Sequence, residues 1–159
     1  MRFPRRYAPA VLAVIGLALP TSLPVRADKG DISAPVRGQR IVRTALSYRG
    51  CRYRFGGNSR SGFDCSGFTK YLYGTAEGVG LPRTAAQQFR SGQKISRAKL
   101  QPGDLLFFST RGRYVGHVGI YAGNGQMIHA ANPRKGVTVS PVFAGYYARR
   151  LVGIRRPVG

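Results

Sequence analysis

Three side chains in this sequence could carry out covalent chemistry: the thiol of Cys65 and the imidazoles of His117 and His129. Cys65 stands where a loop rich in Gly and Ser gives way to a helical pattern that includes Phe68 and Leu72. A cysteine in the first turn of a helix faces unpaired backbone N–H groups and the positive end of the helix dipole. Both favour the thiolate, which is the species that attacks a carbonyl. The alternative is a small buried residue that happens to begin a helix.

The two histidines lie on the runs that flank Gly123-Asn124-Gly125, a strong hairpin signal. With a three-residue loop over 123–125, Gly119 faces His129, and His117 is the diagonal neighbour of His129 on the same face. A two-residue loop at Asn124-Gly125 would turn the two imidazoles to opposite faces. Gly125 suits the left-handed position of a three-residue loop with a bulge. We therefore predict that version, with both imidazoles on one face.

This arrangement predicts acyl transfer. His117 would take or share the proton of Cys65, which gives a nucleophile beside an acid for the leaving amine. His129 would orient His117 and hold the right tautomer, in the place where a carboxylate would give stronger support. Backbone N–H groups at the start of the Cys65 helix, helped by the hydroxyl of Tyr53, would stabilise the oxyanion.

The same residue types allow two other interpretations. The C-x13-C and H-x11-H spacings match no compact zinc motif, so we expect no metal and no other cofactor. Disulfides form in exported proteins, and one between Cys51 and Cys65 would leave Cys65 unable to act as a nucleophile. The histidines favour two free thiols instead, with Cys51 half-buried near the site.

The first 27 residues have the pattern of a signal peptide. Basic residues are followed by an apolar run too short to span a bilayer and by a V-x-A site that would leave Asp28 first. We expect an exported protein of the periplasm, cell envelope or extracellular space, with no transmembrane segment in the mature chain. Residues 28–38 show no periodic pattern of apolar residues and are expected to form a flexible N-terminal segment.

The formal charge is +21, and removal of residues 1–27, which hold four arginines and no acids, leaves about +17. Such a charge attracts polyanions, and export argues against nucleic acid as the partner. We expect the arginines and lysines to contact an anionic envelope surface; a compositional bias of the source is the alternative.

Helical patterns come first along the chain and extended patterns second. Helices are expected over 39–49, from Cys65 to a stop at Gly74, and from an N-cap at Thr84 through Phe89. Short strands are expected at 105–108, 115–121, 126–130, 136–140 and 149–155, the first of them buried on both faces. Four to six such strands and the helices before them predict an α+β fold, with an antiparallel sheet packed on the Cys65 helix.

Several motifs resemble the NlpC family of cell-wall cysteine peptidases over about residues 39–156. They are Gly50-Cys51-Arg52-Tyr53-Arg54-Phe55-Gly56-Gly57, Asp64-Cys65-Ser66-Gly67-Phe68, Leu81-Pro82-Arg83-Thr84-Ala85-Ala86-Gln87-Gln88, Pro102-Gly103-Asp104-Leu105, His117-Val118-Gly119-Ile120-Tyr121 and Ile128-His129-Ala130. The resemblance implies a papain-like catalytic domain that hydrolyses amide bonds in peptidoglycan stem peptides or cross-links.

The resemblance implies a role for each matching residue. Cys65 matches the nucleophile, His117 the base and His129 the third polar residue. Tyr53 matches a tyrosine near the thiolate. Asp64 and Ser66 match residues that hold polar groups of the stem peptide in some relatives. For Asp64 the alternative is a helix cap.

Two features depart from the family pattern. Cys51 stands where relatives often have a small or β-branched residue, which keeps a redox role open. Many relatives also carry wall-binding repeats, for which this chain has no room, so wall contact is expected to rest on its own arginines. The chain is expected to be a monomer.

Two alternative functions remain. An amidase or transpeptidase would use the same Cys–His site with a different bond or acceptor. A non-catalytic basic protein would coat the envelope and keep only a vestigial site.

Overall fold

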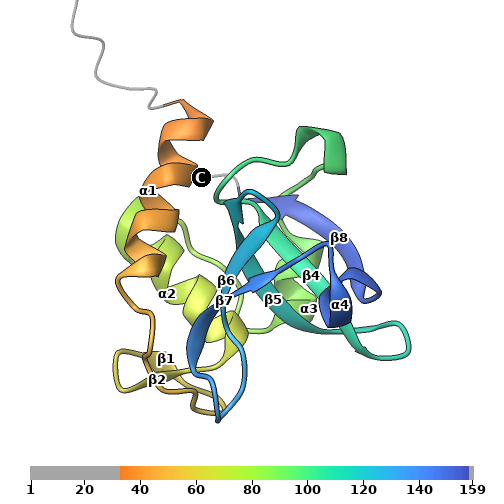
Figure 1. Ribbon diagram of the computed structural model, residues 1–159. Helices are drawn as coiled ribbons and strands as arrows, with labels where there is room; N and C mark the ends of the chain where they lie inside the picture. The colour runs from red at the N-terminus through yellow and green to blue at the C-terminus, as the bar shows by residue number, and fades with distance from the viewer. Residues whose placement is uncertain (1–32, 158–159) are drawn as a thin grey trace, which may run out of the picture. The chain divides into compact units, whose positions relative to one another are not determined.

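The computed structural model describes residues 33–157, in which four α-helices accompany eight strands (Figure 1). The helices are α1 Ala34–Leu46, α2 Cys65–Glu77, α3 Ala85–Arg90 and α4 Gly145–Ala148, with a 3₁₀ turn at Arg97–Lys99. The longer strands are β4 Leu105–Arg111, β5 Tyr114–Gly123, β6 Gln126–Ala130, β7 Val137–Pro141 and β8 Leu151–Arg156. The short strands are β1 Asn58–Ser59, β2 Gly62–Phe63 and β3 Gln93–Lys94.

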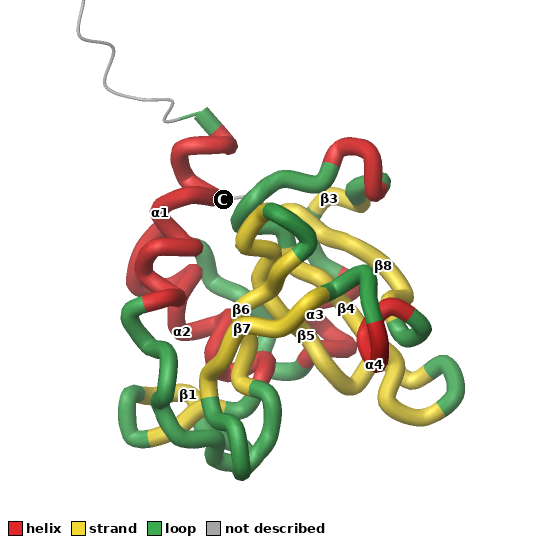
Figure 2. Tube along the Cα trace, in the orientation of Figure 1, coloured by secondary structure: helices red, strands yellow, loops and turns green. Residues whose placement is uncertain are grey.

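Six of these strands form one antiparallel sheet in the order β3-β8-β4-β5-β6-β7. Figure 2 shows the helices of the N-terminal half gathered beside this sheet. The prediction of an α+β fold, with helices preceding an antiparallel sheet, is confirmed.

Strand β4 is the centre of the core, as its continuous apolar run predicts. Leu105 and Phe107 pack in the cluster that includes the helices, whereas Leu106 and Phe108 pack in a second cluster with Met127. All four β4 side chains are at most 1% exposed. The prediction that this strand is buried on both faces is confirmed.

Helices α1 and α2 differ from the expectation at their boundaries, and α1 ends at Leu46, short of the expected residue 49. Helix α1 begins at Ala34, so part of the segment expected to be flexible is helical. Gly38 lets this part of the helix pack closely on Pro102, because a Cβ there would lie 1.8 Å from the carbonyl oxygen of Pro102. Helix α2 runs past Gly74 and ends only at Gly78, which adopts the left-handed conformation with φ 68°. A glycine ends a helix when it takes that conformation, and Gly74 does not.

The expected signal peptide, residues 1–27, lies outside the described residues. Within residues 33–157, no helix has both the length and the apolar character needed to cross a membrane.

The first turn of α2 is held in place by close backbone contacts. Asp64 is the N-cap, and its side chain accepts a hydrogen bond from the N–H of Gly67 at 2.7 Å. The N–H of Asp64 in turn donates to the carbonyl oxygen of Gly57 at 3.0 Å. A Cβ on Gly67 would lie 2.0 Å from that same oxygen. The loop and the helix start can therefore approach this closely only if residue 67 is glycine.

This contact predicts opposite effects for two glycines of one helix. Gly67→Ala should lower the free energy of unfolding by about 1–3 kcal/mol, because the new methyl group forces the helix start away from Gly57. In Gly74→Ala the new methyl group has no atom within 4 Å, so the free energy of unfolding should rise by roughly 0.5–1 kcal/mol. Urea unfolding of both variants and the parent measures the difference. Equal stability of the two variants would contradict this account of the helix start.

Candidate active site

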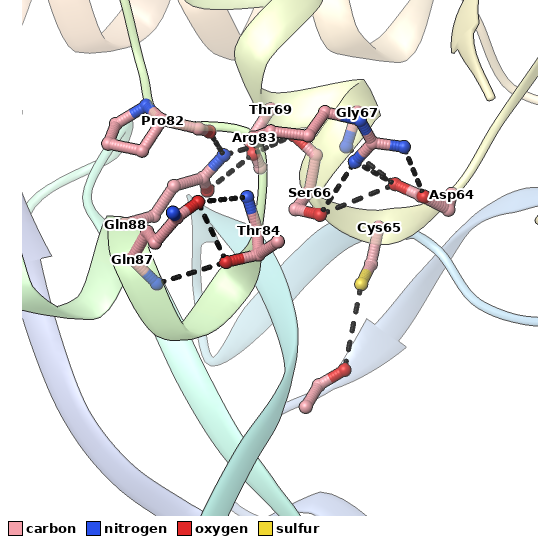
Figure 3. A network of polar contacts seen from close by, with 11 residues as sticks. Asp64, Cys65, Ser66, Gly67, Thr69, Pro82, Arg83, Thr84, Gln87 and Gln88 are labelled. Atoms are coloured by element: carbon pink, nitrogen blue, oxygen red, sulfur yellow. Dashed lines mark hydrogen bonds and ion pairs between the residues drawn. The ribbon is translucent and has the colours of Figure 1, made fainter. Parts of the chain in front are cut away.

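Cys65 is the first residue of α2, and its side chain is 8% exposed. Its Sγ donates a hydrogen bond to the carbonyl oxygen of Gly116 on β5 at 3.8 Å. Figure 3 shows the sulfur directed away from the polar contacts of Asp64 and Ser66. Cys51 is half-buried, and both thiols are free, as expected. The thiol thus reaches the residue that precedes His117 in the sequence.

The acidity of Cys65 differs from the expectation based on the helix start alone. Burial raises the pKa of the Cys65 thiol above its usual value, and the charge of Asp64 acts in the same direction. Backbone groups of Val118, Ser66 and Cys65 itself lower it, but they do not offset the loss of solvation. Burial therefore opposes the preference for thiolate that the helix start alone predicts, and it favours the neutral thiol.

The hairpin that carries the histidines has the predicted register but not the predicted loop. Gly123 pairs with Gln126, so the turn contains only Asn124 and Gly125, both with positive φ (50° and 68°). A register shift follows between Tyr121 and Gly123, beyond which Ile120 pairs with Ile128. The bulge takes up one residue and restores the register that a three-residue loop would produce. The prediction that both imidazoles share one face is confirmed, although the loop was wrong.

The two imidazoles are joined directly. Nε2 of His117 and Nδ1 of His129 lie 2.7 Å apart, and Nε2 of His129 lies 3.0 Å from Oγ of Ser140 on β7. His129 is fully buried. When Ser140 accepts from Nε2–H of His129, Nδ1 of His129 must accept from Nε2–H of His117. In that tautomer Nδ1 of His117 carries no proton and can accept one from a thiol.

Loss of solvation also favours the neutral form of both imidazoles, although His117 is only half-buried. It lowers the pKa of His117 to about 4. It lowers the pKa of His129 to about 3, with smaller contributions from the charges of His117 and Lys135. A neutral imidazole can take a proton from a neutral thiol as the sulfur attacks, without a separated ion pair in the resting state.

Two tyrosines surround these groups. The ring of Tyr147 on α4 stacks on His117 with centroids 5.8 Å apart and meets His129 edge-on at 5.2 Å. Burial raises the pKa of Tyr53, and it raises the pKa of Tyr147 to about 12, with smaller electrostatic contributions that include Cys65 in both cases. Both tyrosines are therefore within electrostatic reach of the thiol. Tyr53 was expected there from the sequence, whereas Tyr147 was not.

Asp64 and Ser66, both expected at the site, meet a third residue that sequence reasoning missed. Arg83 contacts the Asp64 carboxylate with two nitrogens, at 2.6 and 3.1 Å, and Oγ of Ser66 at 3.2 Å (Figure 3). Asp64 is thus both the helix cap and half of a two-pronged ion pair. Arg83 lies in a recognised motif, but nothing in its spacing points to Asp64.

Side chains from α3 fix the position of this cluster. Gln88 is fully buried and donates to the carbonyl oxygen of Ser66 at 3.0 Å, while it accepts from Thr69 at 2.8 Å. Thr84 caps α3 in a reciprocal capping box with Gln87, which confirms the predicted N-cap. Helix α3 therefore holds Arg83 beside the start of α2.

Ser140 is a further residue that the sequence did not reveal, because a serine near the end of a strand has no distinguishing signal. Among residues 33–157, no group of three or more His, Cys, Asp and Glu side chains is placed to hold a metal ion. The groups assembled here are instead a thiol, an imidazole pair and backbone N–H donors, a set that supports nucleophilic acyl transfer.

Comparison with known proteins gives consistent matches. The chain is 40% identical over 134 residues to a gamma-DL-glutamyl hydrolase of Bacillus subtilis, covering 83% of this chain and 31% of that protein. It is 43% identical over 116 residues to a probable endopeptidase p60 of Listeria monocytogenes, covering 73% of this chain and 23% of that protein. It thus spans less than a third of the length of these two curated relatives.

Among solved structures, an NlpC/P60 family protein from Bacillus cereus superposes with a TM-score of 0.72 at 35% identity, covering 77% of this chain and 40% of that one. The α+β domain accordingly has the papain-like fold of such proteins. Residues 50–156, which include the thiol, both imidazoles and the Arg83 cluster, match the family as a whole. The chain belongs to the NlpC/P60 family.

Proposed function

We propose that this protein is an exported cysteine endopeptidase that hydrolyses amide bonds in peptidoglycan stem peptides or cross-links. The observation that carries the proposal is the hydrogen bond of the Cys65 thiol to Gly116. Gly116 directly precedes His117 in the sequence, and His117 is hydrogen-bonded to His129. Similar proteins are named endopeptidases and a peptidoglycan hydrolase, which supports the substrate class.

In the proposed reaction the Sγ proton passes to Nδ1 of His117 as the sulfur attacks the peptide carbonyl carbon. The N–H groups at the start of α2 and the hydroxyl of Tyr53 stabilise the oxyanion. The C–N bond then breaks, and the amine takes the proton from Nδ1 and leaves. A water molecule, deprotonated by His117, hydrolyses the thioester and restores the thiol.

The roles of His129 and Ser140 follow from the tautomer. His129 accepts the Nε2–H of His117 and so keeps Nδ1 available as the base. Ser140 accepts from the far nitrogen of His129 and fixes its ring. A neutral histidine stabilises an imidazolium less than a carboxylate would, so positioning is the larger part of its contribution.

Asp64, Arg83 and Ser66 would contact the acyl side of the stem peptide. They lie at the start of the helix that carries the nucleophile, and the charged side chains of Asp64 and Arg83 are only partly buried, whereas Ser66 is buried. Paired charges of this kind can bind the amine and carboxylate groups of a peptide end.

The surplus of basic residues supports contact with the envelope. Within residues 33–157 the only acids in the sequence are Asp64, Glu77 and Asp104, and each forms an ion pair with an arginine. The arginines and lysines that remain would attract the anionic wall, and we propose that the protein acts there as a monomer.

The first prediction concerns the nucleophile and base. Cys65→Ala should abolish hydrolysis of purified peptidoglycan, and His117→Ala should slow it roughly 10²–10⁴-fold, because the thiol loses its base. Cys51→Ala, the matched cysteine control, should retain activity. Mass spectrometry of the released muropeptides measures all three. Cleavage by the Cys65→Ala protein near the parent rate would refute the proposal.

The second prediction concerns the hydrogen-bonded chain behind His117. His129→Ala should lower kcat by roughly 10–100-fold and Ser140→Ala by roughly 2–10-fold, in proportion to the hydrogen bonds each removes. KM should change little, since neither side chain is expected to touch the substrate. If Ser140→Ala lowers kcat more than His117→Ala does, the proposed order of the hydrogen-bonded series His117–His129–Ser140 is wrong.

The third prediction concerns pH. A base must be neutral to act, and a pKa of about 4 keeps His117 neutral well below the ordinary histidine value of 6.5. The profile of kcat/KM should therefore stay level as the pH falls from about 7 to about 5 and decline only below that. An acid limb centred at or above 6.5 would mean that the imidazoles are not buried in the working enzyme.

A further inference from the structure

A pocket of about 390 Å³ opens beside His117. The residues that line it include His117, Phe108, Tyr146, Tyr147, Asn132 and Lys135. Cys65 is not among the lining residues, and none of them is acidic. The pocket therefore adjoins the proposed base but not the nucleophile.

Lys135 supplies the charge of this pocket. Its backbone N–H donates to Oδ1 of Asn132 at 3.1 Å, and the same oxygen accepts from Arg134, so a short turn fixes the backbone on the pocket wall. Within residues 33–157, its Nζ has no hydrogen-bond or ion-pair partner. The acids in that range are already paired with other residues, so the ammonium is available for an anion.

Lys135 interacts electrostatically with the histidine pair. Its charge makes a small contribution to lowering the pKa of His129, after burial and the charge of His117. Tyr147 links the two regions, since its ring lines the pocket and also stacks on His117. Tyr146 is 55% exposed and gives the pocket an aromatic outer wall.

The position of the pocket indicates which half of a substrate it would receive. In the proposed mechanism His117 gives its proton to the amine that leaves. The leaving half must therefore lie along the wall that contains His117, away from the Asp64–Arg83–Ser66 cluster at the start of α2. This step depends on the proposed function, whereas the pocket and its charge do not.

We propose that this pocket binds the leaving half of the substrate through a carboxylate held by Lys135. The side chain of the residue that supplies the released amine would extend over the tyrosines and place its carboxylate at the ammonium. The enzyme would thus prefer peptides with a free carboxylate on that residue over peptides in which it is a carboxamide.

Two matched peptides test this preference. They share the acyl half and differ only in a side-chain carboxylate or carboxamide on the leaving residue. The parent protein should cleave the carboxylate peptide with a kcat/KM about tenfold higher, the value of one charge-assisted hydrogen bond. In Lys135→Met this ratio should fall toward one, mainly through KM, whereas Lys135→Arg should keep most of it.

Lys94→Met serves as the matched control, because Lys94 is an exposed lysine on β3 that does not line the pocket. It should keep the parent ratio, which separates a local contact from a general effect of charge. An unchanged ratio in Lys135→Met, with hydrolysis that still requires Cys65, would overturn the pocket assignment and leave the proposed function intact.

A binding experiment tests the pocket independently of hydrolysis. The Cys65→Ala protein should bind the amine fragment with a carboxylate about tenfold more tightly than its carboxamide, and Lys135→Met in the same background should remove the difference. NMR titration measures both affinities. If the parent cleaves neither peptide, the proposed function fails, while this titration still decides the pocket: equal affinity for the two fragments would overturn it.

Discussion

The hydrogen bond between His117 and His129 depends on the register of two strands, and the rest of the site depends on that bond. Side chains alternate along a strand, so a slip of one residue would place the two imidazoles on opposite faces of the sheet. The Asn124-Gly125 turn alone would produce that slip. The bulge between Tyr121 and Gly123 corrects it, and the rings meet at 2.7 Å. A local irregularity of the ladder therefore sets the geometry on which the proposed base, its tautomer and its supporting hydrogen bonds all rely.

Burial determines the charge state of this site. A helix start favours a thiolate, and a nearby imidazole is commonly expected to share its proton. Here the loss of solvation is the larger effect, since it raises the pKa of Cys65 and lowers that of both histidines. Tyr147 contributes by covering both imidazole rings. The charges needed for attack would then develop only as the substrate arrives, where backbone N–H groups can stabilise them.

Two charged features accompany the catalytic residues proposed here: the Arg83–Asp64 ion pair and Lys135 of the pocket. Acids are few, and within residues 33–157 each is paired with an arginine, which leaves Lys135 in the pocket without a counter-ion. The Arg83–Asp64 pair stands at the start of α2, and Lys135 stands beyond His117. A peptide bound across the nucleophile would meet a charged group at either end, which suits a substrate that carries free carboxylates.

Local signals in the sequence were enough for much of the fold. A cysteine at a helix start, the cap at Thr84 and the apolar run of β4 each depend on neighbours in the chain, and each is found as predicted. Arg83 and Ser140 could not be found in this way. Their partners lie 19 and 11 residues away, and only the packing of α3 on α2 and of β7 on β6 brings them together. Sequence by itself determined which groups could react, because side-chain chemistry and short-range periodicity are local. The tertiary structure decided their register, tautomer and charge, because these depend on contacts between distant segments and on the exclusion of water.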